Sequence, residues 1–244
     1  MRLIIYEEIM LIVGHRGVSG YYPENTQASI EAAARLGLKW IEVDIQLTKD
    51  NHLVIAHDAS IDRCSNGHGT ISELTLKQLK QYNFGSWFDH CRFGSEKILT
   101  IEELFQIAQH LSLSINLELK VFQKASEQLC NQLEKSLSLS SFPINNIIFS
   151  SFDHQALLNL KQKLPNAKLG ALCERLDDKT KALIDNVSAY SCHLHHLSVT
   201  NNDIDYLHDK GVQAWAYTVN KPEQIDRLGS IDAIFTDFPD RFII

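Results

Sequence analysis

The sequence has no long hydrophobic run, no excess of basic residues and no Cys-x-x-Cys pair. Because no stretch approaches about 18 apolar residues, we expect neither a transmembrane helix nor stable membrane anchoring. The net charge of −7, from 23 basic and 30 acidic residues, disfavours a nucleic-acid-binding protein. With 44% hydrophobic and 22% charged residues, the chain has an ordinary globular composition. That composition excludes a disordered chain, a coiled coil and a collagen-like repeat.

The cysteines indicate the compartment. There are 5 of them, an odd number, and their spacings are wide. We therefore expect reduced thiols in a cytoplasmic protein rather than a disulfide framework or a zinc site. The N-terminal segment contains Glu7 and Glu8 and has no small-residue cleavage site, which argues against a signal peptide. Residues 1–9 could be a poorly ordered extension.

Short apolar runs rich in β-branched residues alternate with stretches of helical periodicity. The runs cover residues 11–14, 40–46, 115–119, 146–151, 169–173, 189–194, 212–217 and 233–237. Strand–helix alternation predicts parallel strands with right-handed crossovers, so we predict an α/β fold, a (β/α)8 TIM barrel forming a single domain over residues 1–244. The alternative is a doubly wound open sheet. That fold usually has a Gly-rich phosphate turn after its first strand, and residues 14–17, GHRG, lack its pattern.

Helices are expected between these runs. The predicted ranges are residues 26–36, 100–111, 125–139, 153–164, 201–210 and 221–228. Thr100 with Glu103 has the spacing of a capping box, and Asp153 is a candidate N-cap. Gly211 and Gly229 each follow a predicted helix, where the left-handed conformation is common.

Residues 47–99 interrupt the alternation of strands and helices, and this segment is too long for a normal strand–helix connection. Within them, residues 52–57 read as a hairpin partner of the second strand. A short helix is expected from Thr75, with Gln78 closing a capping box. We interpret residues 47–99 as a small insertion after the second strand, on the C-terminal face of the barrel.

Three acidic residues are candidates for a metal site. Glu42 and Asp44 point to one face of the second strand, about 6–7 Å apart. Both faces of a barrel strand are covered, so such a pair is costly unless a cation neutralises it; the alternative is an exposed polar strand face. Glu118 on the next barrel strand could complete a set of oxygen ligands, which favours Mg²⁺ or Ca²⁺. Lys120 beside it suits a bound anion or an internal salt bridge.

Other candidates stand at strand ends, where barrel enzymes carry their catalytic groups. His15 and Arg16 lie between two glycines, in a functional turn or a plain surface loop. His57 ends the strand of the insertion and could share acid–base work with His15, although most single histidines are not catalytic. Trp215 could line a substrate wall or simply pack in the barrel. Together the candidates suggest metal-assisted hydrolysis of a phosphoryl ester.

The motifs together resemble the glycerophosphodiester phosphodiesterase family, over nearly the whole chain and in the order of that family. The matching segments are residues 15–17 (HRG), 23–26 (PENT), 42–44 (EVD), 57–58 (HD), 62–69 (DRCSNGHG), 118–120 (ELK), 151–152 (SF), 215–220 (WAYTVN) and 236–239 (TDFP). One such segment is weak evidence, but the ordered set is specific.

The resemblance implies roles for individual residues. His15 and His57 would carry acid–base chemistry, and Arg16 and Lys120 would bind phosphate. One divalent cation, Mg²⁺ or Ca²⁺, would be held by Glu42, Asp44 and Glu118. A polar residue facing the site would be His193, with His195 and His196 left open as alternatives.

The implied substrate is a glycerophosphodiester such as glycerophosphocholine, cleaved to glycerol 3-phosphate and an alcohol. The glycerol 2-hydroxyl would attack phosphorus, and water would then open the cyclic phosphate. One alternative is a lysophospholipase D-type enzyme, for which aromatic residues at 84–93 could form an apolar edge. A second alternative, from another class, is a non-catalytic metal-binding barrel.

Overall fold

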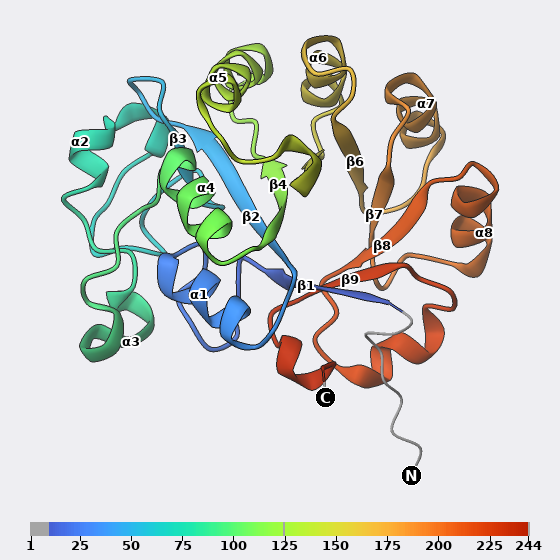
Figure 1. Ribbon diagram of the computed structural model, residues 1–244, viewed down its shortest axis with the longest axis horizontal. Coiled ribbons are helices and arrows are strands. Elements are labelled where there is room, and N and C mark those ends of the chain that lie inside the picture. Colours follow the sequence, from blue (N-terminus) through green and yellow to red (C-terminus); the bar gives the residue numbers. More distant parts are fainter. Residues whose placement is uncertain (1–9, 124, 244) are drawn as a thin grey trace.

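The computed structural model of the protein describes residues 10–123 and 125–243 (Figure 1). In this part of the chain one sheet has the strand order β1-β9-β8-β7-β6-β5-β4-β2-β3, and a further β1–β2 pairing closes it into a barrel. Neighbouring barrel strands are parallel, so the predicted (β/α)8 barrel is confirmed and the open sheet is excluded. The extension considered for residues 1–9 lies outside the described residues.

Each predicted barrel strand is present. They are β1 (Leu11–His15), β2 (Trp40–Leu47), β4 (Ser114–Leu119), β5 (Ile147–Ser151), β6 (Lys168–Cys173), β7 (Ser191–His195), β8 (Gln213–Tyr217) and β9 (Ala233–Thr236). Apolar and β-branched residues favour these strands because helices cover their outer faces and side chains fill the barrel.

The helices form the outer layer of the barrel (Figure 1). Five of them match predicted ranges: α1 (Gln27–Arg35), α4 (Ile101–His110), α5 (Ser126–Leu139), α6 (His154–Lys163) and α8 (Asn201–Asp209). The capping box of Thr100 and the N-cap of Asp153 are both present. The helix predicted at 221–228 is instead a 3-10 helix, Pro222–Arg227, in which Gln224 N–H bonds three residues back to the Lys221 carbonyl.

The prediction missed α7 (Asp178–Val187), between β6 and β7. Its buried residues include the polar Thr180, and charged residues fill the rest of its first turn, so its apolar stripe is short. The Asp177 side chain caps it by accepting from the Thr180 N–H.

Two apolar clusters fill the barrel region. The larger lies between strands and helices. The smaller one fills the barrel interior and consists of Val13, Ile148, Trp215, Ala233 and Phe235. Val13 and Trp215 each lie two residues before a strand-end residue on the same face, so the cluster is the floor beneath the polar strand ends.

The insertion after β2 contains β3 (Leu53–Ile55), α2 (Leu76–Leu79) and α3 (Ser86–Phe93). As predicted, β3 pairs antiparallel with β2, and the Thr75–Gln78 capping box forms. The helix α3 was not predicted. A separate apolar cluster, which includes Ile61, Ile71 and Phe84, lies within residues 47–99, whose assignment as an insertion subdomain stays a prediction. No helix in the described ranges is long and apolar enough to cross a bilayer.

Candidate active site

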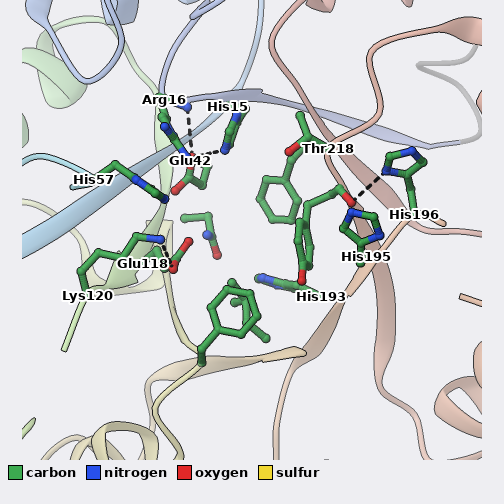
Figure 2. Close-up of a pocket in the computed structure, with 15 residues that line it drawn as sticks. His15, Arg16, Glu42, His57, Glu118, Lys120, His193, His195, His196 and Thr218 are labelled. Carbon is green, nitrogen blue, oxygen red and sulfur yellow. Dashed lines mark hydrogen bonds and ion pairs between the residues drawn. The ribbon is translucent and has the colours of Figure 1, made fainter. Parts of the chain in front are cut away.

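A cavity of about 340 Å³ opens at the C-terminal ends of the strands, a size common for small-molecule sites (Figure 2). Figure 2 shows charged residues on one side and histidines with Thr218 on the facing side. The charged side is formed by His15, Arg16, Glu42, His57, Glu118 and Lys120. The structure therefore brings together most of the site residues predicted from the sequence.

The three predicted carboxylates form one buried group. Asp44 is directly opposite Glu118 in the β2–β4 pairing, and Glu42 lies two residues before Asp44 on the same face. Each carboxylate offers an oxygen within 4.8 Å of the others. Exposure of Glu42 is 3%, of Asp44 1% and of Glu118 8%, so the exposed polar strand face considered above does not occur.

Burial and the crowding of negative charge change the pKa values of these carboxyl groups. Burial and the carboxylates of Asp44 and Glu118 raise the pKa of Glu42 well above its usual value. Burial and Asp44 likewise raise the pKa of Glu118 to about 7. For Asp44, burial acts in the same direction, but Lys120 and Arg16 outweigh it and hold the pKa well below its usual range.

A divalent cation fits this group. The Oε1 atom of Glu42 is buried and has no hydrogen-bond partner, which is costly for an ionised carboxylate. Oxygen ligands from acidic side chains are those preferred by Mg²⁺ and Ca²⁺. A cation here would supply the missing partner and offset the mutual repulsion that raises the pKa values of Glu42 and Glu118.

Lys120 and Arg16 flank the carboxylates. The Lys120 Nζ lies 2.5 Å from Glu118 Oε1 and 3.2 Å from Asp44 Oδ1. Arg16 Nε lies 3.4 Å from Asp44 Oδ2, and the Arg16 backbone N–H donates to Glu42 Oε2 over 3.0 Å. Internal salt bridges are thus present. The side chains of Arg16 and Lys120 also line the cavity, where an anion could contact them.

Residues 14–17 form the turn that aims His15 and Arg16. Gly17 has φ +84°, and a Cβ on it would lie 2.3 Å from the hydroxyl of Ser29, so the turn requires glycine. Arg16 itself has φ +51°. Such a backbone conformation is uncommon for a residue with a side chain, and it is held here by bonds from Asn25 N–H and the Ser29 hydroxyl to the Arg16 carbonyl.

Residues 23–26, PENT, support the charged side from behind. Asn25 donates to Asp44 Oδ2 over 2.9 Å and accepts from the Asp44 backbone N–H over 3.3 Å. Glu24 accepts from Arg16 over 2.7 Å and from both terminal nitrogens of Arg63. The motif therefore orients a candidate metal ligand and a candidate phosphate ligand.

His15 is held by a residue whose role the sequence did not indicate. His15 Nδ1 lies 2.6 Å from Asp237 Oδ1, and its Nε2 lies 3.8 Å from Glu42 Oε2. Asp237 also accepts from the Ser19 hydroxyl over 2.7 Å and from the Asn220 amide over 2.6 Å. A carboxylate can only accept here, so Nδ1 carries the proton and Nε2 is left for the cavity.

His57 has a matching arrangement. Its Nδ1 lies 2.7 Å from Asp58 Oδ1, and Asp58 in turn accepts from Arg63 Nε over 2.6 Å. Figure 2 shows His15 and His57 both pointing toward Glu42, from different sides. Two imidazoles with Nδ1 bonded to carboxylates are suited to proton transfer through Nε2.

The sequence left open which of His193, His195 and His196 faces the site. All three line the cavity. His193 lies deepest and is fully buried; burial lowers its pKa to about 3, so it is neutral. Trp215 does not line the cavity. Its ring stacks under His193 at 5.0 Å, which is the packing role considered as the alternative to a substrate wall.

Comparison with known proteins agrees with this site. A model of the glycerophosphoryl diester phosphodiesterase family matches residues 15–241. The chain belongs to this family. A glycerophosphodiester phosphodiesterase of Caldanaerobacter subterraneus is 33% identical over 237 residues, covering 96% of each chain. One from Bacillus subtilis is 29% identical and covers 96% of this chain and 85% of its own length.

A solved structure extends the comparison to the fold. A phosphodiesterase of Oleispira antarctica, in complex with the product sn-glycerol-3-phosphate, superposes with a TM-score of 0.89 at 28% identity. The match covers 98% of this chain and 97% of the other. Family membership makes this protein an enzyme, a phosphodiesterase acting on glycerophosphodiesters, and the non-catalytic barrel is set aside.

Proposed function

We propose that the protein hydrolyses glycerophosphodiesters to glycerol 3-phosphate and an alcohol, using one divalent cation and a pair of histidines. The observation that carries this proposal is the buried carboxylate group facing two carboxylate-bound imidazoles in one cavity. The product named for the Oleispira antarctica phosphodiesterase supports glycerol 3-phosphate as the product here.

Glu42, Asp44 and Glu118 would hold the cation, Mg²⁺ or Ca²⁺. When bound, it would polarise a phosphate oxygen and lower the pKa of a nearby glycerol hydroxyl. Arg16 and Lys120 line the cavity beside these carboxylates and would bind the remaining phosphate charge. An acidic protein can thus accept an anionic substrate, because the charge of the site is reversed locally.

His15 and His57 would move the protons. One Nε2 takes the proton of the glycerol 2-hydroxyl as that oxygen attacks phosphorus, and the other protonates the departing alcohol. A water molecule then opens the cyclic phosphate, with the two histidines exchanging roles. Asp237 and Asp58 keep each ring in the tautomer and orientation that this exchange needs.

The test is release of glycerol 3-phosphate from a panel of glycerophosphodiesters, assayed with Mg²⁺, with Ca²⁺ and with a chelator. We expect release that stops in the chelator and returns with one of the cations. His15→Ala and His57→Ala should each lose about 10²–10⁴ in kcat, the usual contribution of a positioned acid or base. A matched control is His68→Ala, an exposed histidine of the insertion that does not line the cavity. Near-normal kcat in either active-site variant would refute the scheme.

The lysophospholipase D alternative gains no support from residues 84–93. Phe84 and Phe93 are buried, and Trp87 and Phe88 pack edge-on against each other. Trp87 and Phe88 are partly exposed, but none of the four aromatic residues lines the cavity. The cytoplasmic location stays a prediction, supported by five free cysteines.

A further inference from the structure

The cavity has an uncharged wall opposite the carboxylates. Among its lining residues on the β5–β8 side there is no acidic residue, no lysine and no arginine. Three ring-bearing residues, Phe152, Tyr217 and His195, border the outer part of this wall. His195 and Tyr217 are the last residues of β7 and β8 and are directly opposite in register, and Phe152 follows β5.

The three rings are arranged nearly at right angles. The centroids of Phe152 and Tyr217 are 5.9 Å apart with an interplanar angle of 90°, and those of Tyr217 and His195 are 5.6 Å apart at 82°. The Tyr217 hydroxyl donates to the Cys173 carbonyl over 3.1 Å, which fixes the middle ring. Phe152 is 46% exposed, so its ring is open to a ligand.

Hydrogen bonds keep the neighbouring imidazole of His196 neutral. Its Nδ1 lies 3.2 Å from the Tyr217 carbonyl, which can only accept, and its Nε2 lies 2.8 Å from the Gln224 amide nitrogen, which can only donate. With His193 also neutral beneath, the two imidazoles add no charge that would repel a cationic ligand.

The wall lies where the alcohol half of the substrate would be bound. The glycerol half is the same in every glycerophosphodiester and rich in hydroxyls, so it suits the polar end formed by Asn116, Glu42 and Glu118. The alcohol half varies in size and needs space near the mouth. His195 and Tyr217 lie one step of the strand pleat above the floor residues His193 and Trp215, toward that mouth.

We propose that Phe152, Tyr217 and His195 form a subsite for the leaving alcohol that favours a quaternary ammonium head group over a primary ammonium or an uncharged one. This inference rests on the proposed function. A trimethylammonium group has no N–H to satisfy and is attracted to aromatic faces. A primary ammonium loses strong hydration and finds no carboxylate among the residues of this wall, because Glu42 and Glu118 lie on the opposite side of the cavity and the nearby Glu174 is exposed and does not line it.

The first experiment separates charge from shape. We would measure kcat/KM for glycerophosphocholine, glycerophosphoethanolamine, glycerophosphoglycerol and the 3,3-dimethylbutyl ester, an uncharged isostere of the choline ester. Attraction between the cation and the rings predicts a preference of about five- to tenfold for the choline ester over its isostere and over the ethanolamine ester. Equal turnover of the choline ester and its isostere would overturn the proposal.

The second experiment removes a ring face and keeps apolar volume. Phe152→Leu should lower kcat/KM for the choline ester about fivefold and change the glycerophosphoglycerol value less than twofold. The matched control is Phe88→Leu, at a ring that is 36% exposed on the insertion and outside the cavity. It should leave every ratio unchanged. A uniform loss on all substrates in Phe152→Leu would contradict a head-group subsite.

The two proposals fail differently. If no glycerophosphodiester in the panel releases glycerol 3-phosphate, the proposed function is wrong. If all are hydrolysed with similar kcat/KM, the function stands and the aromatic subsite is wrong.

Discussion

Replacing Asp237 by Asn tests whether the carboxylate bound to His15 matters for proton transfer. Asp237 Oδ1 accepts from His15 and Ser19, and Oδ2 accepts from Asn220. An amide keeps the shape but turns one acceptor into a donor. If the new amide nitrogen faces His15, it favours the wrong tautomer of that imidazole. If it faces Asn220, two N–H donors point at each other. In both cases a charge-assisted hydrogen bond is lost.

The magnitude follows from that bond. Hydrogen bonds to charged groups contribute about 1.5–3 kcal/mol, and about 1.4 kcal/mol corresponds to tenfold in rate. We therefore expect Asp237→Asn to lower kcat about 10- to 150-fold. Asp237 does not line the cavity, so KM should change little, by less than about threefold.

The assay is steady-state release of glycerol 3-phosphate, with thermal unfolding measured for every variant. Asp240→Asn is the matched control, because among the described residues this nearby carboxylate accepts only from the exposed Tyr21 hydroxyl. It should keep the wild-type kcat. If Asp237→Asn retains at least half of the wild-type kcat while His15→Ala loses it, Asp237 does not position His15 for catalysis.

Two further predictions concern stability. Gly17→Ala should destabilise the protein more than Gly37→Ala does. The two glycines have similar φ angles, +84° and +88°, but of the two only a Cβ at Gly17 would clash, with atoms of Ser29. Gly37→Ala should cost about 1–2 kcal/mol in unfolding free energy, and equal losses in urea melts would contradict the crowding argument. Hydrogen bonds from Arg63 and His57 lower the pKa of Asp58 to about 2, against a smaller opposing effect of burial. The ionised carboxylate therefore stabilises the fold fully above its unfolded pKa of about 4. This stabilisation is lost as the pH falls toward about 2. The stability gap between wild type and Asp58→Asn should therefore be larger at pH 6 than at pH 3, and a constant gap would refute the assignment.

Local patterns were enough to predict the barrel. Apolar runs of strand length alternate with helical stretches along the whole chain, and the strand pleat puts Glu42 and Asp44 on one face whatever surrounds them. Capping residues such as Thr100 and Asp153 marked helix starts because they act on backbone groups within three residues. The helix α7 was missed because a helix packed on a barrel needs only a short apolar stripe.

Partners distant in sequence were harder to predict. Asp237 was recognised only as part of the family segment 236–239, with no role assigned to it, although it binds His15 across 222 positions of the chain. A signal was present: closing a barrel pairs β1 with β9, in register Gly14↔Thr236, so the next residue of each strand must be a neighbour. Similarly, the connection of Glu24 to Arg63 depends on how the insertion packs, which periodicity does not describe.

The pairing of β1 with β9 means that the active site is completed only when the last strand of the barrel is in place. During synthesis, Asp237 is added 222 residues after its partner His15. A nascent chain that has not yet reached β9 has an open barrel edge and an unsupported His15. Contacts between residues so far apart also form slowly during folding. Phosphodiesterase activity is therefore a sensitive reporter of complete folding, and truncations before residue 233 should be inactive even where the helices form.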